Sequence, residues 1–175
     1  STSQHKGALG SGWHHEYDWA IIPHLLDEVL EVRLGDGRSV IMPELDLGNS
    51  YYHRQDKLTL SRDLEGYVIR TEDYHYYRFD ESGSKEWPLV SISNTSGQQI
   101  LLEYGAWGGL EKITDSCGRV LNIETDGLNR ITAIQGPHPD REGETFTMMR
   151  YVYDEAGDLV QTFDALDHEA SYAYE

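Results

Sequence analysis

The apolar residues of this chain fall in short runs, many of which alternate with polar residues at a period of two, and Gly, Asp or Asn separates the runs. Such alternation between turn residues is typical of β-strands joined by tight turns. Residues 31–34 and 39–42 are two such runs, and they flank Asp36 and Gly37. An Asp-Gly pair in that position predicts a hairpin with a primed turn, in which Gly adopts positive φ without steric cost. Further hairpins are expected where residues 58–61 turn at 63–66 into 67–70, and where residues 76–79 turn near Gly83.

One segment allows a second interpretation. In residues 21–30, Leu25, Leu26, Val29 and Leu30 have helical spacing, and Pro23 would suit a first helical turn. The continuation over residues 29–34 alternates better as a strand. A strand is therefore the preferred prediction.

An internal repeat of 21 residues covers the second half of the chain. Residues 102–110 align with residues 123–131, and the turn residue Gly108 aligns with Asn129, a residue type that tolerates the left-handed conformation. Gly97 and Gly118 have the same spacing. The pattern returns 28 residues on, at 153–159, after an insertion near residues 136–140, and Tyr174 follows Tyr153 by 21. A chain that stops one residue into a new unit is expected to be a fragment.

A single hairpin cannot bury its own apolar face, so neighbouring hairpins must pair edge to edge. The predicted fold is all-β, with antiparallel β-hairpin repeats in a curved open sheet that is a fragment of a larger shell. We expect an opening segment with hairpins over residues 1–78 and period-21 hairpins over 79–175. The residues assigned structural roles in the repeat are Tyr104, Gly108, Leu110, Asp115, Gly118, Arg119, Asp126, Asn129, Ile131, Tyr153, Asp154, Gly157, Leu159 and Tyr174.

The motif Tyr-Asp-x-x-Gly-x-Leu, clearest at residues 153–159, resembles the YD repeats of the Rhs family. The opening motif is similar to the segment that precedes those repeats in Rhs proteins, and it consists of Gly10, Gly12, Trp13, Tyr17 and Asp18. The resemblance covers nearly the whole chain. Some units are imperfect, since Thr125 stands where Tyr is expected and Gly105 where Asp is expected.

The resemblance implies a bacterial polymorphic toxin, made in the cytoplasm and exported, often by type VI secretion. In such proteins a YD-repeat shell encloses a C-terminal toxin domain. The chain would then be a non-catalytic structural fragment without cofactor or metal. Its partners would be the rest of the shell, the toxin cargo and, through domains absent from this sequence, secretion-system spike proteins. The alternative is a YD-repeat module that binds carbohydrate or a cell surface. A hydrolase, the third class, would need several weak candidate residues to converge in one pocket.

Composition narrows the choice of partners. The formal net charge is −17, with 31 acidic and 14 basic residues, so no nucleic-acid partner is expected. No apolar run is long enough to span a bilayer, and residues 1–10 do not have the pattern of a signal peptide. The one cysteine, Cys117, has no disulfide partner within the chain. An open last strand predicts edge-to-edge self-association.

Candidate catalytic and metal-binding groups are weak. His14 and His15 are adjacent, so on a strand they would point to opposite faces, and only His24 is near them in sequence. Cys117 lies beside Arg119 but near no histidine, and a turn role is the simpler interpretation. The carboxylate pairs Glu142/Glu144 and Asp154/Asp158 are expected from the abundance of acids, and residues 105–109 lack the Lys of a phosphate loop. Asn94-Thr95-Ser96 matches a glycosylation acceptor but is interpreted as a polar turn.

Aromatic residues offer one more candidate site. The tryptophans Trp13, Trp19, Trp87 and Trp107, together with several tyrosines, could form a stacking face for a ligand. Cross-strand aromatic pairs also hold the register of β-sheets, and this is the preferred interpretation.

Overall fold

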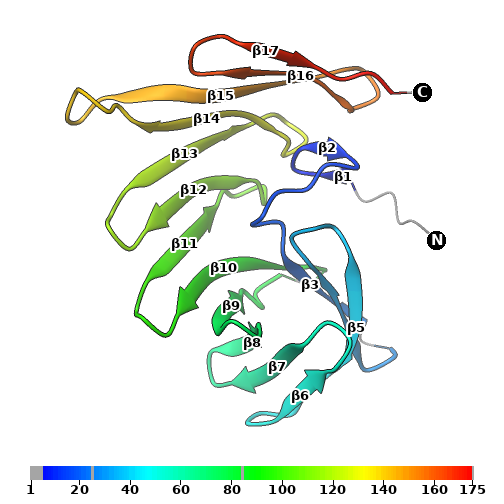
Figure 1. Ribbon diagram of the computed structural model, residues 1–175. Coiled ribbons are helices and arrows are strands. Elements are labelled where there is room, and N and C mark those ends of the chain that lie inside the picture. The colour runs from blue at the N-terminus through cyan, green and yellow to red at the C-terminus, as the bar shows by residue number, and fades with distance from the viewer. Residues whose placement is uncertain (1–5, 25, 84, 175) are drawn as a thin grey trace. The chain divides into compact units, whose positions relative to one another are not determined.

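A computed structural model describes residues 6–24, 26–83 and 85–174 of the 175-residue chain (Figure 1). All regular elements in these ranges are β-strands, and their pairing is antiparallel. This confirms the predicted all-β, antiparallel class. The strands are β1 (Lys6–Gly7), β2 (Gly10–Ser11), β3 (Ala20–His24), β4 (Val29–Arg33), β5 (Ser39–Pro43), β6 (Ser50–His53), β7 (Leu58–Asp63), β8 (Gly66–Arg70), β9 (His75–Phe79), β10 (Trp87–Asn94), β11 (Gln99–Tyr104), β12 (Leu110–Asp115), β13 (Val120–Thr125), β14 (Ile131–Pro137), β15 (Thr145–Tyr153), β16 (Leu159–Asp164) and β17 (Glu169–Ser171).

The strands belong to two compact units. The central unit comprises Glu16–Leu101, and the hairpin unit comprises Ser1–His15 together with Leu102–Glu175. The compact units divide near residues 15 and 101, and the sequence regions 1–78 and 79–175 stay a prediction.

The central unit has a continuous apolar core. Strands β3, β4 and β5 pair in order, and β3 also pairs with β10 through Trp87 and Ile21. Strands β6 to β10 pair with their neighbours in chain order. Their inward positions alternate, as in β8, where Tyr67 and Ile69 are both fully buried. The largest fully buried side chains of the unit are Tyr67, Phe79, Ile21, Leu30, Met42, Leu60, Ile69, Leu89 and Val32.

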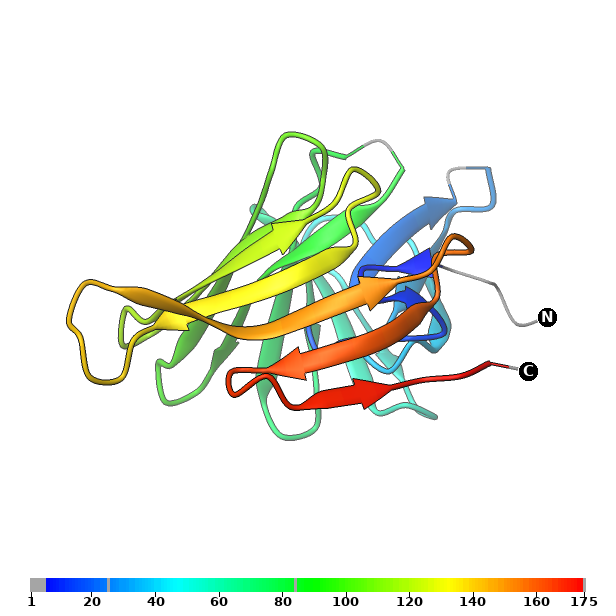
Figure 2. The same cartoon turned by 90° about the horizontal axis from the view of Figure 1, so that it is seen from above.

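The hairpin unit is a meander in which β12 to β17 lie side by side in chain order (Figures 1 and 2). Each strand buries few residues, for example Ile123 in β13, and β15 alternates only between exposed and half-buried positions. The buried hydrophobic residues of the unit are mostly Leu and Ile: Leu102, Leu110, Ile113, Ile123, Ile131, Ala133 and Leu159. This unit therefore depends less on apolar burial than the central unit does.

Over residues 21–24 and 26–30, the ambiguous segment forms part of β3, a turn and the start of β4, with no helix among these residues. Strand β3 ends at His24, and its five residues pair with the five of β4. The preferred strand prediction is confirmed over the described residues, and Leu25 lies outside them. Among the described residues no helix long and apolar enough to cross a membrane is found.

The turn predicted at Asp36-Gly37 has a different geometry from the expected one. Gly37 has φ 81°, but Asp36 does not adopt positive φ. The Leu34 N–H donates to the Arg38 carbonyl, and the Gly37 N–H donates to the Leu34 carbonyl. The loop therefore holds three residues and ends in one left-handed residue, which is the other common hairpin connection.

Candidate functional site

The hairpin turns share one hydrogen-bonding pattern, and Asp126 shows it fully. One carboxylate oxygen of Asp126 accepts the backbone N–H groups of Leu128 and Arg130 at 2.9 and 3.0 Å, and the other accepts Arg130 Nε at 2.7 Å. Asn129 completes the turn with φ 62°. The side chain at the first turn position thus takes up two backbone donors that the reversing chain would otherwise leave open.

Asp115 repeats this pattern, with Cys117 and Arg119 as donors and Gly118 at φ 78°. Hydrogen bonds from Arg119, first from its backbone N–H and then from its side chain, lower the pKa of Asp115. Related turns begin at Asn94, Asp154 and Asp164. The signature of this turn is therefore an Asp or Asn three residues before a Gly, Asn or Asp that adopts positive φ.

The N-terminal segment lies against the β14, β15 and β16 region of the hairpin unit. The Ala8 carbonyl accepts the Ile131 N–H at 2.7 Å, and Tyr153 Oη donates to the Ile131 carbonyl at 2.6 Å. A Cβ on Gly10 would lie 2.7 Å from the Gly157 carbonyl oxygen. Since Gly10 also has φ 88°, only glycine suits this approach. Burial raises the pKa of Tyr153 well above its ordinary value, so its hydroxyl stays a donor.

Tyr174, near the C-terminal end of the unit, also contacts the N-terminal segment. Trp13 Nε1 donates to Tyr174 Oη at 2.7 Å, and Tyr174 Oη donates to the Leu159 carbonyl at 2.6 Å. The Trp13 ring also meets Tyr172 edge-on, with centroids 4.9 Å apart. The structure thus brings Gly10 and Trp13 of the opening motif together with Tyr153, Gly157, Leu159 and Tyr174 of the repeat.

The other predicted site residues lie elsewhere. A Cβ on Gly12 would have no neighbour within 4 Å, and Tyr17 and Asp18 belong to the central unit. Leu110 and Ile131 are buried, whereas Tyr104 is half-buried in β11.

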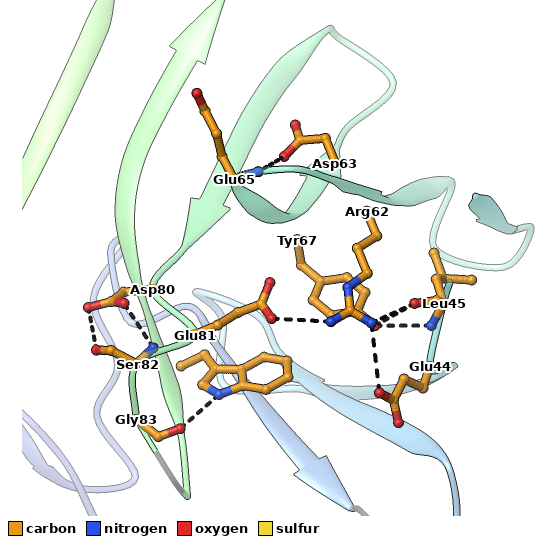
Figure 3. Close-up of polar contacts among 11 residues, drawn as sticks. Glu44, Leu45, Arg62, Asp63, Glu65, Tyr67, Asp80, Glu81, Ser82 and Gly83 are labelled. Carbon is orange, nitrogen blue, oxygen red and sulfur yellow. Dashed lines mark hydrogen bonds and ion pairs between the residues drawn. The ribbon is translucent and has the colours of Figure 1, made fainter. Parts of the chain in front are cut away.

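The central unit contains a polar cluster around Arg62 (Figure 3). Arg62 Nη1 donates to the Leu45 carbonyl at 2.8 Å, and the guanidinium lies 4.9 Å from the centroid of the Tyr67 ring. Two carboxylates flank it, Glu44 at 3.9 Å and Glu81 at 3.7 Å. No sequence signal identified this cluster, because its members come from separate hairpins.

Tyr67 anchors the cluster from within the core. Its hydroxyl donates to the Leu45 carbonyl at 3.2 Å and accepts the Leu45 N–H at 3.0 Å. Its ring stacks on Trp87 at 5.6 Å, and Trp87 Nε1 donates to the Gly83 carbonyl. Burial is the main cause that raises the pKa of Tyr67. Because Tyr67 is fully buried and bonds both polar backbone groups of Leu45, the cluster holds the segment after β5 against β7 and β8.

Arg33 is a second charged group that sequence reasoning missed. Its side chain is 9% exposed, and it pairs with Asp18 at 3.6 Å and with Glu86. A buried guanidinium requires such partners, since an unpaired buried charge is costly. Asp18 of the opening motif therefore has a structural partner in the central unit.

The weak chemical candidates are not assembled into a site. Across residues 6–24, 26–83 and 85–174, no group of three or more His, Cys, Asp or Glu side chains could hold a metal ion. His24 pairs with Glu31 at 3.2 Å, Glu144 with Arg141 at 3.2 Å, and Cys117 is exposed on its turn. None of these contacts brings Cys117 beside a histidine.

Comparison with known proteins gives one informative similarity. No family model matches the chain. The chain is 30% identical over 169 residues to the double-stranded DNA deaminase toxin A of Burkholderia cenocepacia strain H111. The matched residues make up 92% of this chain but only 11% of the relative's length.

This similarity corrects four predictions made from the sequence. The relative is named as a toxin that deaminates DNA, which contradicts the assignment to an Rhs YD-repeat shell and the function of a non-catalytic encapsulating fragment. The carbohydrate-binding alternative gains no support from it. It also contradicts the predictions that the protein is not an enzyme and has no nucleic-acid partner.

Two physical reasons explain these errors. The Tyr-Asp-x-x-Gly spacing reports a hairpin turn, as the bonds of Asp115 and Asp126 show, so it is a poor guide to family. Net charge averages over 175 residues and says nothing about residues beyond them. The predicted partners were shell, cargo and spike proteins. These predictions rested on the family assignment and are wrong with it.

Proposed function

We propose that the chain is part of a toxin that deaminates DNA. The observation that carries the proposal is the 30% identity to the double-stranded DNA deaminase toxin, which extends over 92% of the chain. A similarity that runs through nearly all of the hairpins supports a common protein architecture. The reaction is proposed for the whole protein, because the chain spans only 11% of the relative's length.

Zinc is the metal that many nucleobase deaminases use. They hold it with one His and two Cys or with three Cys, beside a Glu that transfers protons. This chain has one cysteine, Cys117, which is exposed on a turn. The residues of this chain therefore do not fit a zinc site of that kind.

The roles assigned to the repeat residues are part of the proposal. We assign one unit of 21 residues to two successive hairpin turns, such as those of Gly108 and Gly118. Their φ values of 83° and 78° and the turn bonds of Asp115 support this assignment. Residues 1–78 and 79–175 remain the proposed sequence regions, and the opening motif is proposed to hold the N-terminal segment against the hairpins.

A bacterial origin and export from the producing cell are also proposed, since the similar protein is a bacterial toxin. Delivery by type VI secretion and a role in competition between bacteria stay predictions.

The test is a deamination assay on the complete gene product that contains this chain. Purified protein is incubated with double-stranded DNA, and the DNA is then sequenced while released ammonia is measured. Hydrolytic deamination consumes water and replaces an amino group with a carbonyl oxygen, so base changes and ammonia must rise together. The same DNA made single-stranded is the matched substrate control. Unchanged DNA with folded, intact protein would overturn the proposal.

A further inference from the structure

A hollow in the hairpin unit lies between two turns on the same edge of the meander. These are the β11–β12 turn at residues 105–109 and the β13–β14 turn at residues 126–130. The hollow has a volume of about 530 Å³ and is lined by Gly105, Trp107, Gly109, Glu111, Thr125, Asp126, Gly127 and Asn129. None of the roles proposed above uses it.

Trp107 is the most exposed aromatic residue that lines this hollow. Its side chain is 90% exposed, whereas Trp87 is buried and Trp13 is hydrogen bonded to Tyr174. Asn129 Nδ2 donates to the Trp107 carbonyl at 2.7 Å, so the neighbouring turn holds the backbone that carries the indole. A large aromatic face on a hydrogen-bonded turn is a stacking platform.

The polar atoms around the platform are mainly acceptors. A Cβ on Gly109 would lie 3.0 Å from Asn129 Oδ1 and 3.1 Å from Thr125 Oγ1, and a Cβ on Gly105 would collide with Glu111 Oε1. The two glycines thus leave room into which three side-chain oxygens point. One N–H of the Asn129 amide donates to the Trp107 carbonyl, and the amide oxygen faces Gly109. Asp126, by contrast, is occupied by Arg130.

We propose that this hollow binds an arginine side chain of a partner polypeptide. A guanidinium has five N–H donors, no acceptor and a flat face, so it stacks on an indole while it donates to carboxylate and amide oxygens. Glu111 supplies the negative charge, and the net charge of −17 favours the approach of a cation. The Glu111 carboxylate favours a cation over a neutral sugar, and it would repel the phosphates of a nucleic acid. This proposal is independent of the deaminase proposal.

The test is a titration followed by NMR, with Nα-acetyl-arginine methylamide added to the chain. The indole N–H signal of Trp107, identified by its loss in Trp107→Ala, is expected to shift and saturate. Glu111→Gln is expected to weaken binding roughly two- to fivefold, as for other exposed ion pairs. The matched control, Glu142→Gln, removes an exposed carboxylate of the β14–β15 loop and should leave binding unchanged.

A parallel titration uses the lysine derivative and methyl glucoside. The lysine derivative should bind more weakly than the arginine derivative, because it lacks the flat face. The proposal would be overturned if the Trp107 signal shifted without saturating, or if the two Glu variants had equal effects on binding. It would also be overturned if methyl glucoside bound as tightly as the arginine derivative. All variants lie at exposed positions, so folding is checked simply by an unchanged spectrum elsewhere.

Discussion

The central unit and the hairpin unit use the same strands and turns but are stabilised in different ways. The ten largest fully buried side chains of the described residues all belong to the central unit except Leu159. The hairpin unit instead repeats the hydrogen-bonded Asp turn and gains the contact of the N-terminal segment through Ala8. Similar alternation along a sequence can therefore lead to a thick core or to a thin sheet held by its turns.

The largest expected effect tests the core directly. Ile69 is fully buried in the central unit, and Ile123, the matched residue of the hairpin unit, is 7% exposed. Ile69→Ala should lower the free energy of unfolding by about 2–5 kcal/mol, because it leaves a cavity in a closely packed core. Ile123→Ala should cost about 2 kcal/mol or less, since a thin sheet can relax around it. Urea unfolding measures both, and equal losses would remove the contrast between the units.

Gly10→Ala tests the contact of the N-terminal segment. The new Cβ would meet the Gly157 carbonyl at 2.7 Å and would also impose positive φ on alanine, for a total cost of roughly 2–4 kcal/mol. The Ile131 amide, which donates to Ala8, should then exchange faster with solvent. Gly12→Ala is the control, because its φ is positive but no atom lies within 4 Å of the new Cβ. If Gly12→Ala were as harmful as Gly10→Ala, backbone strain alone would explain the result.

Asp126→Ala tests how much the hydrogen bonds of the turns contribute to stability. The variant removes three accepted hydrogen bonds and should lower the free energy of unfolding by roughly 1–2 kcal/mol. Thermal unfolding measures the change. Asp140→Ala, in the exposed β14–β15 loop, should have little effect. A similar loss in both variants would show that the turn bonds contribute little.

The smallest expected effect is a loss of folding stability at low pH. The Arg78 side chain is the main cause that lowers the pKa of Asp63 from 3.8 to about 2. Since the folded pKa is the lower one, this pair stabilises the fold above about pH 4, and its contribution is lost as the pH falls toward 2. The pair is half exposed, so the change is small. Urea midpoints from pH 5 to pH 2 should fall less for Asp63→Asn than for the unchanged chain, and parallel curves would contradict this role.

Strands and turns could be predicted from the sequence because local chemistry determines them. The runs at residues 58–61 and 67–70 lie in β7 and β8, and the Gly66 that joins them has φ 119°. The predicted turn type at Asp36 was wrong, because an Asp-Gly pair also fits a three-residue loop. Positive φ at Asn129 follows from a residue type that tolerates it.

The polar clusters could not be predicted, since they depend on contacts between distant hairpins. Arg62 meets Leu45 and Glu81, and Arg33 meets Glu86, at separations that no periodicity marks. The hollow at Trp107 had only a weak signal, a tryptophan among glycines that the sequence assigns to a repeat turn and to a possible stacking face. The similarity to a deaminase toxin could not be predicted either, because turn spacing describes a fold that different activities can share.

Native-state hydrogen exchange in increasing urea tests the contrast between the units most directly. Amides of the β7–β8 ladder, around Leu60 and Ile69, should open with the highest free energy and a strong dependence on urea. Amides of β13 and β14, around Ile123 and Ile134, should open at a lower free energy and in a separate step. A single opening step, with one free energy for both ladders, would contradict the account.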